Sequence, residues 1–510
     1  MQPAPQFNLI GKTAMQVAQG RRWPVVLVAL LCGAIAALGQ APLGWWHISV
    51  LGFAGLMGLF QGTPTPRRAA LIGWAGGTGY FLVALNWLVE PFMVDVARHG
   101  WMAPFALGLM SAGLALFWGA SFALARRAGG SALGFISAIT LAEALRGWLF
   151  TGFPWAQPGH IWIGTPVMPL AAYVGALGLI IVTFCVATLV WRALCGRYWY
   201  VGAVAGLFAT LYIVAGLDTP AGPLAGDAPT VRLIQPNAAQ HEKWDPEMIP
   251  VFFQRQVSYT QALPAPDLIV WPETAIPTLL NYAEDVMDVI SSAAGDTPVV
   301  FGAQRWEGQR LHNSMAVLNG LGEVTHVYDK HHLVPFGEYL PFGNVLKRFG
   351  LRGLAAEDGN GYSSGPGPRL LDLGALGKAL PLICYEGVFP RDVAGMPARA
   401  DFILLITNDA WFGQYSGPYQ HLAQARLRSV EQGLPTIRVA NTGVSAMIDA
   451  HGHLTAALSL GTAGYLDARL PAALPATLYS KTGDLPLLIL LFLVFGGVLV
   501  TSRRQVPLSD

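Results

Sequence analysis

Charged residues are scarce in this 510-residue sequence: Asp, Glu, Lys and Arg make up 12% of it, against 53% hydrophobic residues. Soluble domains usually have about 25% charged residues, so this composition predicts a membrane protein. The 31 basic and 30 acidic residues leave a net charge of +1, which offers no electrostatic surplus for nucleic acid. We therefore expect no nucleic-acid partner.

Cysteine is also scarce, with four residues in the chain, and Cys384 is the only one between residues 218 and 483. One cysteine has no intramolecular partner there, so a disulfide scaffold is excluded and the thiol can stay free. No cysteine and histidine spacing typical of zinc sites occurs. We expect neither a metal nor a cofactor.

Long apolar stretches, in contrast, are abundant. A transmembrane helix needs about 20 apolar residues, and we predict spans at 23–40, 43–61, 69–89, 101–125, 132–150, 167–191, 198–217 and 484–501. The predicted organisation is a membrane domain with seven helices (1–217), a large domain (218–483, core about 229–470), and a last helix with a short tail (484–510).

Basic residues orient these spans, because Lys and Arg stay on the cytoplasmic side. They precede the first span and follow every even-numbered one: Lys12, Arg21, Arg22, Arg67, Arg68, Arg126, Arg127, Arg192, Arg197, Arg503 and Arg504. Both termini are therefore expected inside the cell, and the large domain outside.

Two opposite charges stand three residues apart in the fifth predicted span, Glu143 and Arg146. This spacing places them on one helix face, and burying either charge alone is costly, so we expect them to pair. The pair is either a structural ion pair or a grip on a polar lipid headgroup. Trp148 follows at the outer end of the span, where aromatic residues anchor a helix or line a lipid entrance.

From about residue 229 the pattern changes to short apolar runs typical of buried strands, at 231–234, 268–271, 299–301, 380–383 and 402–406. Helical stretches at 246–263, 282–294 and 419–432 separate some of them. This alternation predicts an α/β domain of layered sheets and helices.

Three polar residues follow such runs directly: Glu273, Lys330 and Cys384. Singly, each has an ordinary explanation as a turn glutamate, a solvated lysine or a core thiol. Together they supply a base, a cation for an oxyanion and a nucleophile, which acyl transfer requires. No Gly-x-Ser-x-Gly motif competes with them, and we interpret His331 and His332 as loop residues.

The same three residues carry a family resemblance. The segments 271–273 (WPE), 330–338 (KHHLVPFGE) and 384–386 (CYE) resemble the Glu-Lys-Cys arrangement of the nitrilase superfamily. Within it, the apolipoprotein N-acyltransferases are most similar, because 146–155 (RGWLFTGFPW) and 408–413 (NDAWFG) also look like that family. Soluble nitrilases commonly have tryptophan where Tyr385 stands. The resemblance spans nearly the whole chain.

The resemblance implies an αββα sandwich in the periplasm, attached to the bacterial inner membrane. It implies that a phospholipid, phosphatidylethanolamine by family likeness, donates an acyl chain to the α-amino group of the diacylglyceryl cysteine of apolipoproteins. This last step of lipoprotein maturation would run as a ping-pong reaction through a thioester on Cys384. Glu273 would be the base and Lys330 the oxyanion stabiliser. We expect a monomer.

Further residues are expected around this site, each with a simpler alternative. Glu338 orients Lys330 or the incoming amine, or else forms a loop ion pair. Tyr385 and Glu386 shape the pocket beside the nucleophile. Trp244 matches a tryptophan that the family uses, although an interface aromatic would look the same. Phe342 and Trp411 lie in aromatic segments that either admit lipid as mobile arms or pack in the core.

Two other functions remain open at this stage. A membrane-tethered nitrilase or amidase could hydrolyse a small amide with the same three residues, using water as the second nucleophile. A lipid-binding or transport protein without enzymatic activity would leave the three converging residues unexplained.

Overall fold

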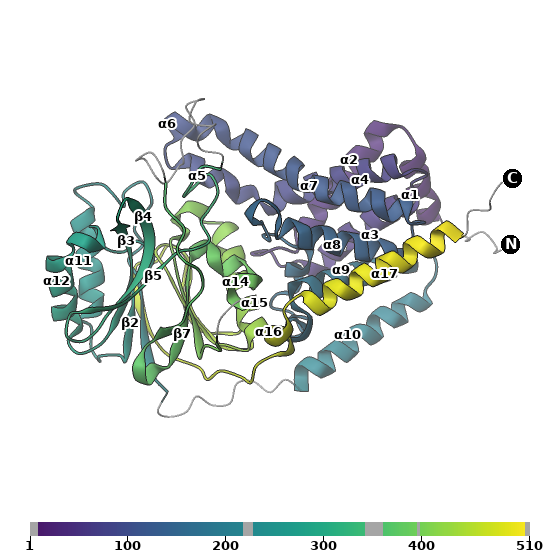
Figure 1. The fold of residues 1–510 in the computed structure, drawn as a ribbon. Helices are drawn as coiled ribbons and strands as arrows, with labels where there is room; N and C mark the ends of the chain where they lie inside the picture. Colours follow the sequence, from purple (N-terminus) through teal and green to yellow (C-terminus); the bar gives the residue numbers. More distant parts are fainter. Residues whose placement is uncertain (1–8, 218–227, 342–360, 395–397, 505–510) are drawn as a thin grey trace. The chain divides into compact units, whose positions relative to one another are not determined.

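The computed structural model describes residues 9–217, 228–341, 361–394 and 398–504. The chain forms two compact units (Figure 1). One unit contains Met1–Val89, His99–Thr219 and Lys481–Asp510, and the other contains Glu90–Arg98 and Pro220–Ser480. The first is helical and the second is built on β-sheets.

Each of the eight predicted apolar stretches overlaps a helix of the first unit. These helices are α2 (Arg22–Ala37), α3 (Trp46–Gln61), α4 (Pro66–Ala84), α7 (Ala103–Arg127), α8 (Ala132–Arg146), α9 (Ala171–Leu194), α10 (Trp199–Leu217) and α17 (Leu485–Arg504), with α1 (Leu9–Gln19) before them.

By length and apolar composition, three helical segments among the described residues could each cross a membrane: Val96–Arg127, Met168–Leu194 and Leu485–Ser502. The bent pair Pro66–Ala84 and Asn86–Met93 would make a fourth. Three more apolar helices are shorter, at Arg22–Ala37, Trp46–Gln61 and Trp199–Thr210. The helical unit is therefore a membrane domain with several apolar helices.

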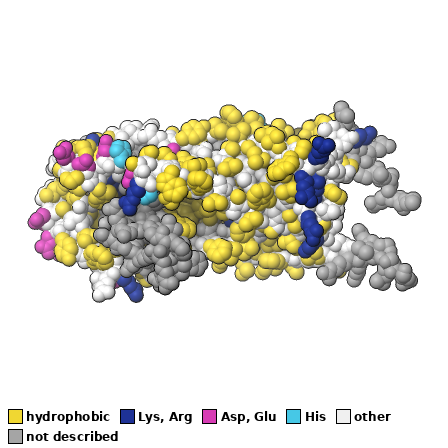
Figure 2. Space-filling view, turned by 90° about the horizontal axis from the view of Figure 1, so that it is seen from above, with side chains coloured by type: hydrophobic (Ala, Val, Ile, Leu, Met, Phe, Trp, Pro, Cys, Tyr) yellow, Lys and Arg dark blue, Asp and Glu magenta, His cyan; other side chains and the backbone are white. Residues whose placement is uncertain are grey.

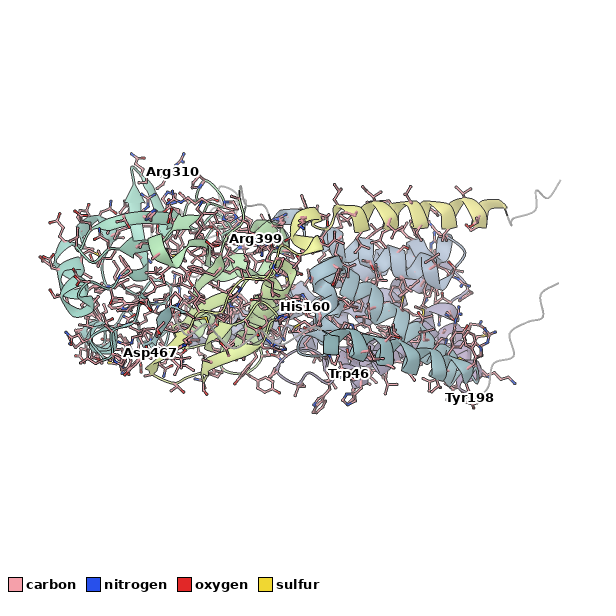
Figure 3. All side chains as sticks on the ribbon, turned by 90° about the horizontal axis from the view of Figure 1, so that it is seen from below. Trp46, His160, Tyr198, Arg310, Arg399 and Asp467 are labelled. Atoms are coloured by element: carbon pink, nitrogen blue, oxygen red, sulfur yellow. The ribbon has the colours of Figure 1, made fainter. Side chains whose placement is uncertain are left out.

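Close backbone contact holds α2 against α4. A Cβ atom on Gly33 would lie 1.8 Å from the carbonyl oxygen of Gly76, so only glycine fits at this crossing. Aromatic rings fill other contacts: Trp46, labelled in Figure 3, packs against Trp162 and Phe208. Figure 2 shows apolar side chains over the flank of this unit, with Lys and Arg side chains gathered at one end.

The predicted pairing of Glu143 with Arg146 is confirmed. The Arg146 guanidinium lies 2.5 Å from the Glu143 carboxylate, and both side chains are fully buried. Trp118 donates its indole N–H to Glu143 at 2.7 Å, and Arg146 also donates to the carbonyl of Trp155 at 3.0 Å. Trp148 lies beyond the helix end and is 62% exposed.

The second unit contains two six-stranded sheets. The order of the first sheet is β12 (Gly464–Arg469), β1 (Thr230–Gln235), β2 (Leu268–Val270), β3 (Val299–Glu307), β4 (Arg310–Leu318) and β5 (Val324–Asp329). The order of the second is β11 (Leu454–Leu458), β10 (Ser445–Ile448), β9 (Thr436–Ala440), β8 (Phe402–Thr407), β7 (Lys378–Ile383) and β6 (Leu371–Asp372).

Helices cover the outer face of each sheet (Figure 1). Helices α11 (Ile249–Thr260) and α12 (Glu284–Ala294) share an apolar core with the first sheet, while α14 (Pro390–Ala394) and α15 (Gly417–Gln432) share one with the second. An ion pair of 2.7 Å joins the buried Arg232 on β1 to the partly exposed Asp467, labelled in Figure 3, on β12. This α/β sandwich and its five predicted strands β1, β2, β3, β7 and β8 confirm the expected fold of the domain.

The direction of the strands brings the polar residues together. Strands β1, β2 and β3 are parallel, and β5 runs in the same direction because two antiparallel pairings connect it to β3. Strands β7, β8 and β9 are parallel in the second sheet. The carboxyl ends of parallel strands meet at one sheet edge, which is where side chains for chemistry converge.

Candidate active site

Glu273 follows β2 in a turn that rests on the main chain of β3. Gly302 donates its N–H to the carbonyl of Pro272 at 3.0 Å and accepts from the N–H of Ala275 at 2.8 Å. A Cβ atom on Gly302 would lie 2.6 Å from the Cα of Glu273, so a side chain there would displace this turn. Because residue 302 is a glycine, the turn can pack directly on β3, and this contact positions Glu273.

Both oxygens of the Glu273 carboxylate have fixed donors. The Asn313 side-chain amide donates to Oε1 at 2.7 Å, and the backbone N–H of Asn408 donates to Oε2 at 2.7 Å. The Lys330 ammonium lies 3.6 Å from Oε1. These contacts orient the buried carboxylate.

Lys330 follows β5 and is buried between two carboxylates. Its Nζ lies 2.9 Å from Glu338 Oε1, so the expected contact of Glu338 with Lys330 is present. Glu338 is itself held by the N–H of Val334 at 2.8 Å and by Asn313 at 3.2 Å. Burial opposes the ammonium charge, but the Glu338 and Glu273 carboxylates outweigh it and raise the pKa of Lys330. Lys330 is therefore a permanent cation.

Cys384 follows β7 and is only 6% exposed. Its φ of 52° lies in the left-handed region, which is uncommon for residues other than glycine and recurs at functional turns. Burial and the Glu273 carboxylate raise the pKa of the Cys384 thiol, while Lys330 and a hydrogen bond with Thr407 act in the opposite direction. The resting thiol is thus protonated and needs a base to become a nucleophile.

Glu386 supports this turn through hydrogen bonds from its main chain. It is fully buried and accepts from the N–H groups of Ile383 at 2.7 Å and His331 at 2.8 Å, and from the Tyr328 hydroxyl at 2.9 Å. Tyr385 is also buried, in edge contact with His332 and Phe389.

His331 and His332 lie in a loop, as the sequence indicates, and both have acidic partners there. His331 Nδ1 lies 2.6 Å from Glu386, and His332 Nδ1 lies 2.6 Å from Asp392. Burial disfavours the charged ring of His331, but Asp392 and Glu386 raise its pKa to about 9. The sequence shows two histidines in a polar stretch and gives no sign of acidic partners about 55 residues away.

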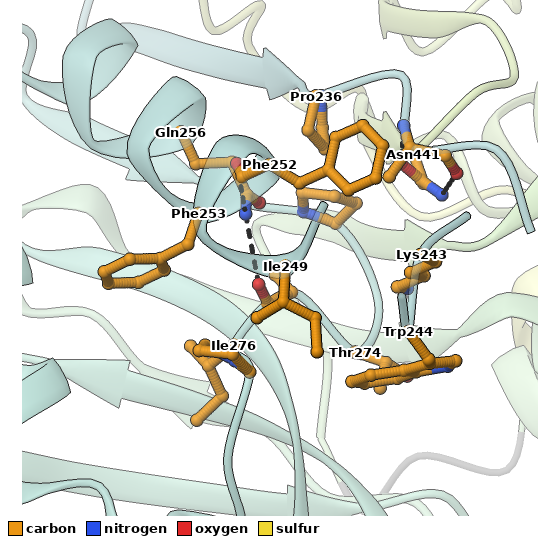
Figure 4. Close-up of a pocket in the computed structure, with 14 residues that line it drawn as sticks. Pro236, Lys243, Trp244, Ile249, Phe252, Phe253, Gln256, Thr274, Ile276 and Asn441 are labelled. Carbon is orange, nitrogen blue, oxygen red and sulfur yellow. Dashed lines mark hydrogen bonds between the residues drawn. The ribbon is translucent and has the colours of Figure 1, made fainter. Parts of the chain in front are cut away.

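A hollow of about 380 Å³, counted with its open mouth, lies beside the Glu273 turn (Figure 4). Its lining includes apolar residues of α11, polar residues such as Gln256 and Asn441, and Trp244, which is 44% exposed. Lys243 donates to the backbone carbonyl of Glu273 at 3.3 Å, and burial lowers its pKa to about 8. Trp244 thus lies next to the candidate base, with the Lys243 ammonium 5.6 Å from the centre of its ring.

Two aromatic residues were also predicted near this site, Trp411 and Phe342. Trp411 is half-buried on η10 (Asp409–Phe412), the turn that follows Asn408. Phe342 lies outside the described residues, so the proposed aromatic arm there has no structural description. Within the described ranges, no group of three or more His, Cys, Asp or Glu side chains could hold a metal ion.

Sequence reasoning missed Asn313, Asn408 and His421. Asn313 lies in the middle of β4 without a distinctive motif, and Asn408 begins the 408–413 segment but acts through its main chain, so its side-chain type does not indicate the contact. His421 lies on α15 with its ring fully buried, and its Nε2 contacts the carbonyl of Cys384 at 3.1 Å. The one sequence signal for His421 is a histidine among the residues of a buried helix face, which indicates a buried polar partner.

Two protein families match this chain. The carbon-nitrogen hydrolase family matches residues 230–477, and the apolipoprotein N-acyltransferase N-terminal domain matches residues 32–191. An apolipoprotein N-acyltransferase of Rhodopseudomonas palustris is 36% identical over 98% of this chain and 99% of its own length. That of Caulobacter vibrioides is 38% identical over 95% of this chain and 96% of its own.

The chain belongs to the apolipoprotein N-acyltransferase family. It is accordingly an acyltransferase of lipoprotein maturation, and the relatives named above are bacterial. Among solved structures, a carbon-nitrogen hydrolase superfamily protein of Xanthomonas campestris covers 51% of this chain and 96% of its own, with 18% identity and a TM-score of 0.36. An amidase from Nesterenkonia sp. covers 52% and 98%, with 18% identity and a TM-score of 0.38.

Proposed function

We propose that this acyltransferase moves an acyl chain from a phospholipid to the α-amino group of the diacylglyceryl cysteine of apolipoproteins, through a thioester on Cys384. The observation that carries the proposal is the buried cluster of Glu273, Lys330 and Cys384. Lys330 lies 3.6 Å from Glu273, and the charges of both residues act on the pKa of the Cys384 thiol. The family supports the choice of lipid donor and lipoprotein acceptor. Phosphatidylethanolamine is the expected donor.

In the first half-reaction, Glu273 takes the thiol proton and the Cys384 thiolate attacks the ester carbonyl of the phospholipid. Lys330 stabilises the oxyanion of the tetrahedral intermediate. Collapse breaks the ester bond, and Glu273 returns its proton to the glycerol oxygen that leaves. The products are a lysophospholipid and a thioester on Cys384.

In the second half-reaction, the lipoprotein amine attacks the thioester carbonyl and Glu273 accepts one of its protons. Collapse forms the amide, expels the Cys384 thiolate and returns the proton to it. Glu338, through its 2.9 Å contact, keeps Lys330 in position throughout. Water would hydrolyse the thioester, so the burial of Cys384 favours transfer over hydrolysis.

We infer that all eight apolar helices cross the bacterial inner membrane, which puts the sandwich domain (218–483) in the periplasm and both termini in the cytoplasm. Helices α2 and α3 have 16 residues each, or about 24 Å, and flanking residues extend them toward the hydrocarbon thickness of about 30 Å. The basic end of the helical unit in Figure 2 supports this orientation. Reporter fusions after α3 and α10 test it, with cytoplasmic and periplasmic signals expected respectively.

Supporting roles follow from position. Trp244 would pack on the substrate at the hollow beside Glu273, and Trp411 and Phe342 would contact acyl chains. Arg146 and Trp148, on the membrane domain, would contact the lipid headgroup, although the pairing of Arg146 with Glu143 already accounts for its charge.

The deciding experiment is mass spectrometry of the peptide that contains Cys384 after the purified protein is incubated with labelled phosphatidylethanolamine. The proposal requires a labelled acyl group on the peptide that contains Cys384, and its loss when a diacylglyceryl lipopeptide is added. A membrane-tethered amidase would leave Cys384 unlabelled by phospholipid and would cleave small amides.

A further inference from the structure

A second buried polar cluster touches the nucleophile but takes no part in the proton transfers above. It consists of Thr407 at the end of β8, Asp409 on η10, His421 on α15 and Arg438 on β9. All four residues are fully buried. Buried polar groups are costly unless they are paired, so the partners of this cluster indicate its use.

The His421 ring bridges a carboxylate and the nucleophile's main chain. Its Nδ1 lies 2.9 Å from Asp409 Oδ1, and its Nε2 lies 3.1 Å from the carbonyl oxygen of Cys384. Burial and Arg438 lower the pKa of the His421 ring against the opposing effect of Asp409. Carboxylate and carbonyl are both acceptors, so the neutral ring donates to the Cys384 carbonyl when its proton is on Nε2. Burial disfavours that carboxylate, but Arg438 and His421 lower the pKa of Asp409 and keep it ionised.

Asp409 reaches Cys384 by a second route. The Thr407 hydroxyl donates to Asp409 Oδ1 at 2.9 Å, and the same hydroxyl forms a hydrogen bond with the Cys384 side chain. Arg438 lies 2.5 Å from the other oxygen of Asp409. One carboxylate thus fixes two groups that contact the carbonyl and the sulfur of Cys384.

Cys384 needs such support because its φ of 52° is unfavourable for a residue with a side chain. A strained conformation persists only where surrounding contacts determine it from several sides. Glu386 fixes the N–H of Ile383, before the nucleophile, at 2.7 Å. The His421 contact fixes the carbonyl on the other side.

We propose that His421, held by Asp409, is a positioning residue that fixes the carbonyl of Cys384 and thereby keeps the thiol within reach of Glu273 and Lys330. This inference rests on the proposed role of Cys384 as the nucleophile. His421 acts through Cys384 and contacts no reacting atom.

Two substitutions separate the two contacts of the ring. In His421→Gln the side-chain amide replaces Nε2 and keeps the bond to Cys384, whereas in His421→Asn it replaces Nδ1 and keeps only the bond to Asp409. The full-length protein in detergent is treated with iodoacetamide, and alkylation of the Cys384 peptide is followed by mass spectrometry. Acyl transfer from phosphatidylethanolamine is measured on the same samples.

We expect His421→Asn to slow both Cys384 alkylation and kcat by about ten-fold or more, with KM for phospholipid unchanged, because a small misplacement of a nucleophile is costly. His421→Gln should restore most of the wild-type rate. Ser429→Ala is the control, since it removes a buried hydrogen bond of 2.7 Å to Thr436 from the same helix.

Equal rates for the Asn and Gln variants would overturn the proposal, as would a Gln variant slower than the Asn variant. If neither variant folds, Asp409→Asn provides the test, because the substitution keeps the size of the side chain and weakens its contact with His421. Unchanged alkylation of Cys384 would again overturn the proposal. If wild-type Cys384 never acquires an acyl group, the proposed function fails, but the alkylation rates still decide the role of His421.

Discussion

The backbone N–H of Asn408 donates to Glu273 Oε2 at 2.7 Å, although 135 residues separate them in the chain. Glu273 follows a strand of the first sheet and Asn408 follows a strand of the second. The candidate base is therefore held in part by the opposite layer of the sandwich. Its geometry depends on how the two sheets pack, and a change far from the thiol can alter it.

Replacing Cys384 with Ala or Ser should leave the fold intact and abolish both the acyl adduct and transfer, because the sulfur forms the proposed thioester. Autoradiography after incubation with labelled phospholipid measures the adduct, and circular dichroism measures the fold. Cys195→Ala is the control, since Cys195 is buried in the helical unit. Transfer retained by the Cys384→Ala protein would refute the assignment.

Asn313→Asp should lower kcat by about 100-fold. Asn313 donates to Glu273 at 2.7 Å and to Glu338 at 3.2 Å, and an aspartate would replace that donor with a third negative charge. Single-turnover acylation measures the effect. Asn319→Asp in the β4–β5 turn makes the same chemical change at an exposed site and should be neutral. An Asn313→Asp enzyme of normal rate would show that Glu273 needs no such support.

His331 should make stability depend on pH. Its pKa is raised from 6.5 to about 9 in the folded protein, chiefly by Asp392 and Glu386 against the effect of burial. Its contribution is fully present below pH 6.5 and is lost as the pH rises through about 9. The contribution is on the order of 1 kcal/mol after solvent screening of a partly exposed group.

Thermal unfolding at pH 6 and pH 9.5 measures this difference. His331→Gln should be less stable than wild type at the lower pH and should approach wild type at the higher pH. His326→Gln on β5 is the control. A His331→Gln protein whose deficit is the same at both pH values would contradict the pairing.

Glu143→Ala should destabilise the helical unit by about 3–5 kcal/mol, because it leaves the Arg146 guanidinium buried without its carboxylate. Trp118→Phe, which removes only the indole donor of the same carboxylate, should cost about 1 kcal/mol. Unfolding in detergent measures both. If the pair served lipid binding alone, KM for phospholipid would rise and stability would stay unchanged.

The positions of Glu273, Lys330 and Cys384 could be predicted because each follows an apolar run, and the ends of parallel strands meet. The pairing of Glu143 with Arg146 follows from helical spacing alone. The local sequence pattern is enough to predict a contact when both partners lie in one helix, or when both follow parallel strands whose ends lie at the same sheet edge.

The contacts of Asn313, Glu386 and His421 could not be predicted in this way. Each depends on which residue of another element lies opposite, and that is set by strand register and layer packing. Glu386 was expected to shape the pocket beside Cys384, but nothing in the sequence indicates its four donors, which are the Tyr328 hydroxyl and the N–H groups of His331, His332 and Ile383. Proximity in sequence does not give the direction of a side chain in a tight turn.

Gly302 has a consequence for how this protein can vary. The main chain of the Glu273 turn occupies the space where any other residue at position 302 would place its first carbon. In a saturation screen scored by growth, position 302 should therefore tolerate substitution as poorly as Glu273, Lys330 and Cys384, although glycine brings no functional group. Such a screen alone would suggest that Gly302 is catalytic, whereas its role is to leave room for the main chain of the Glu273 turn.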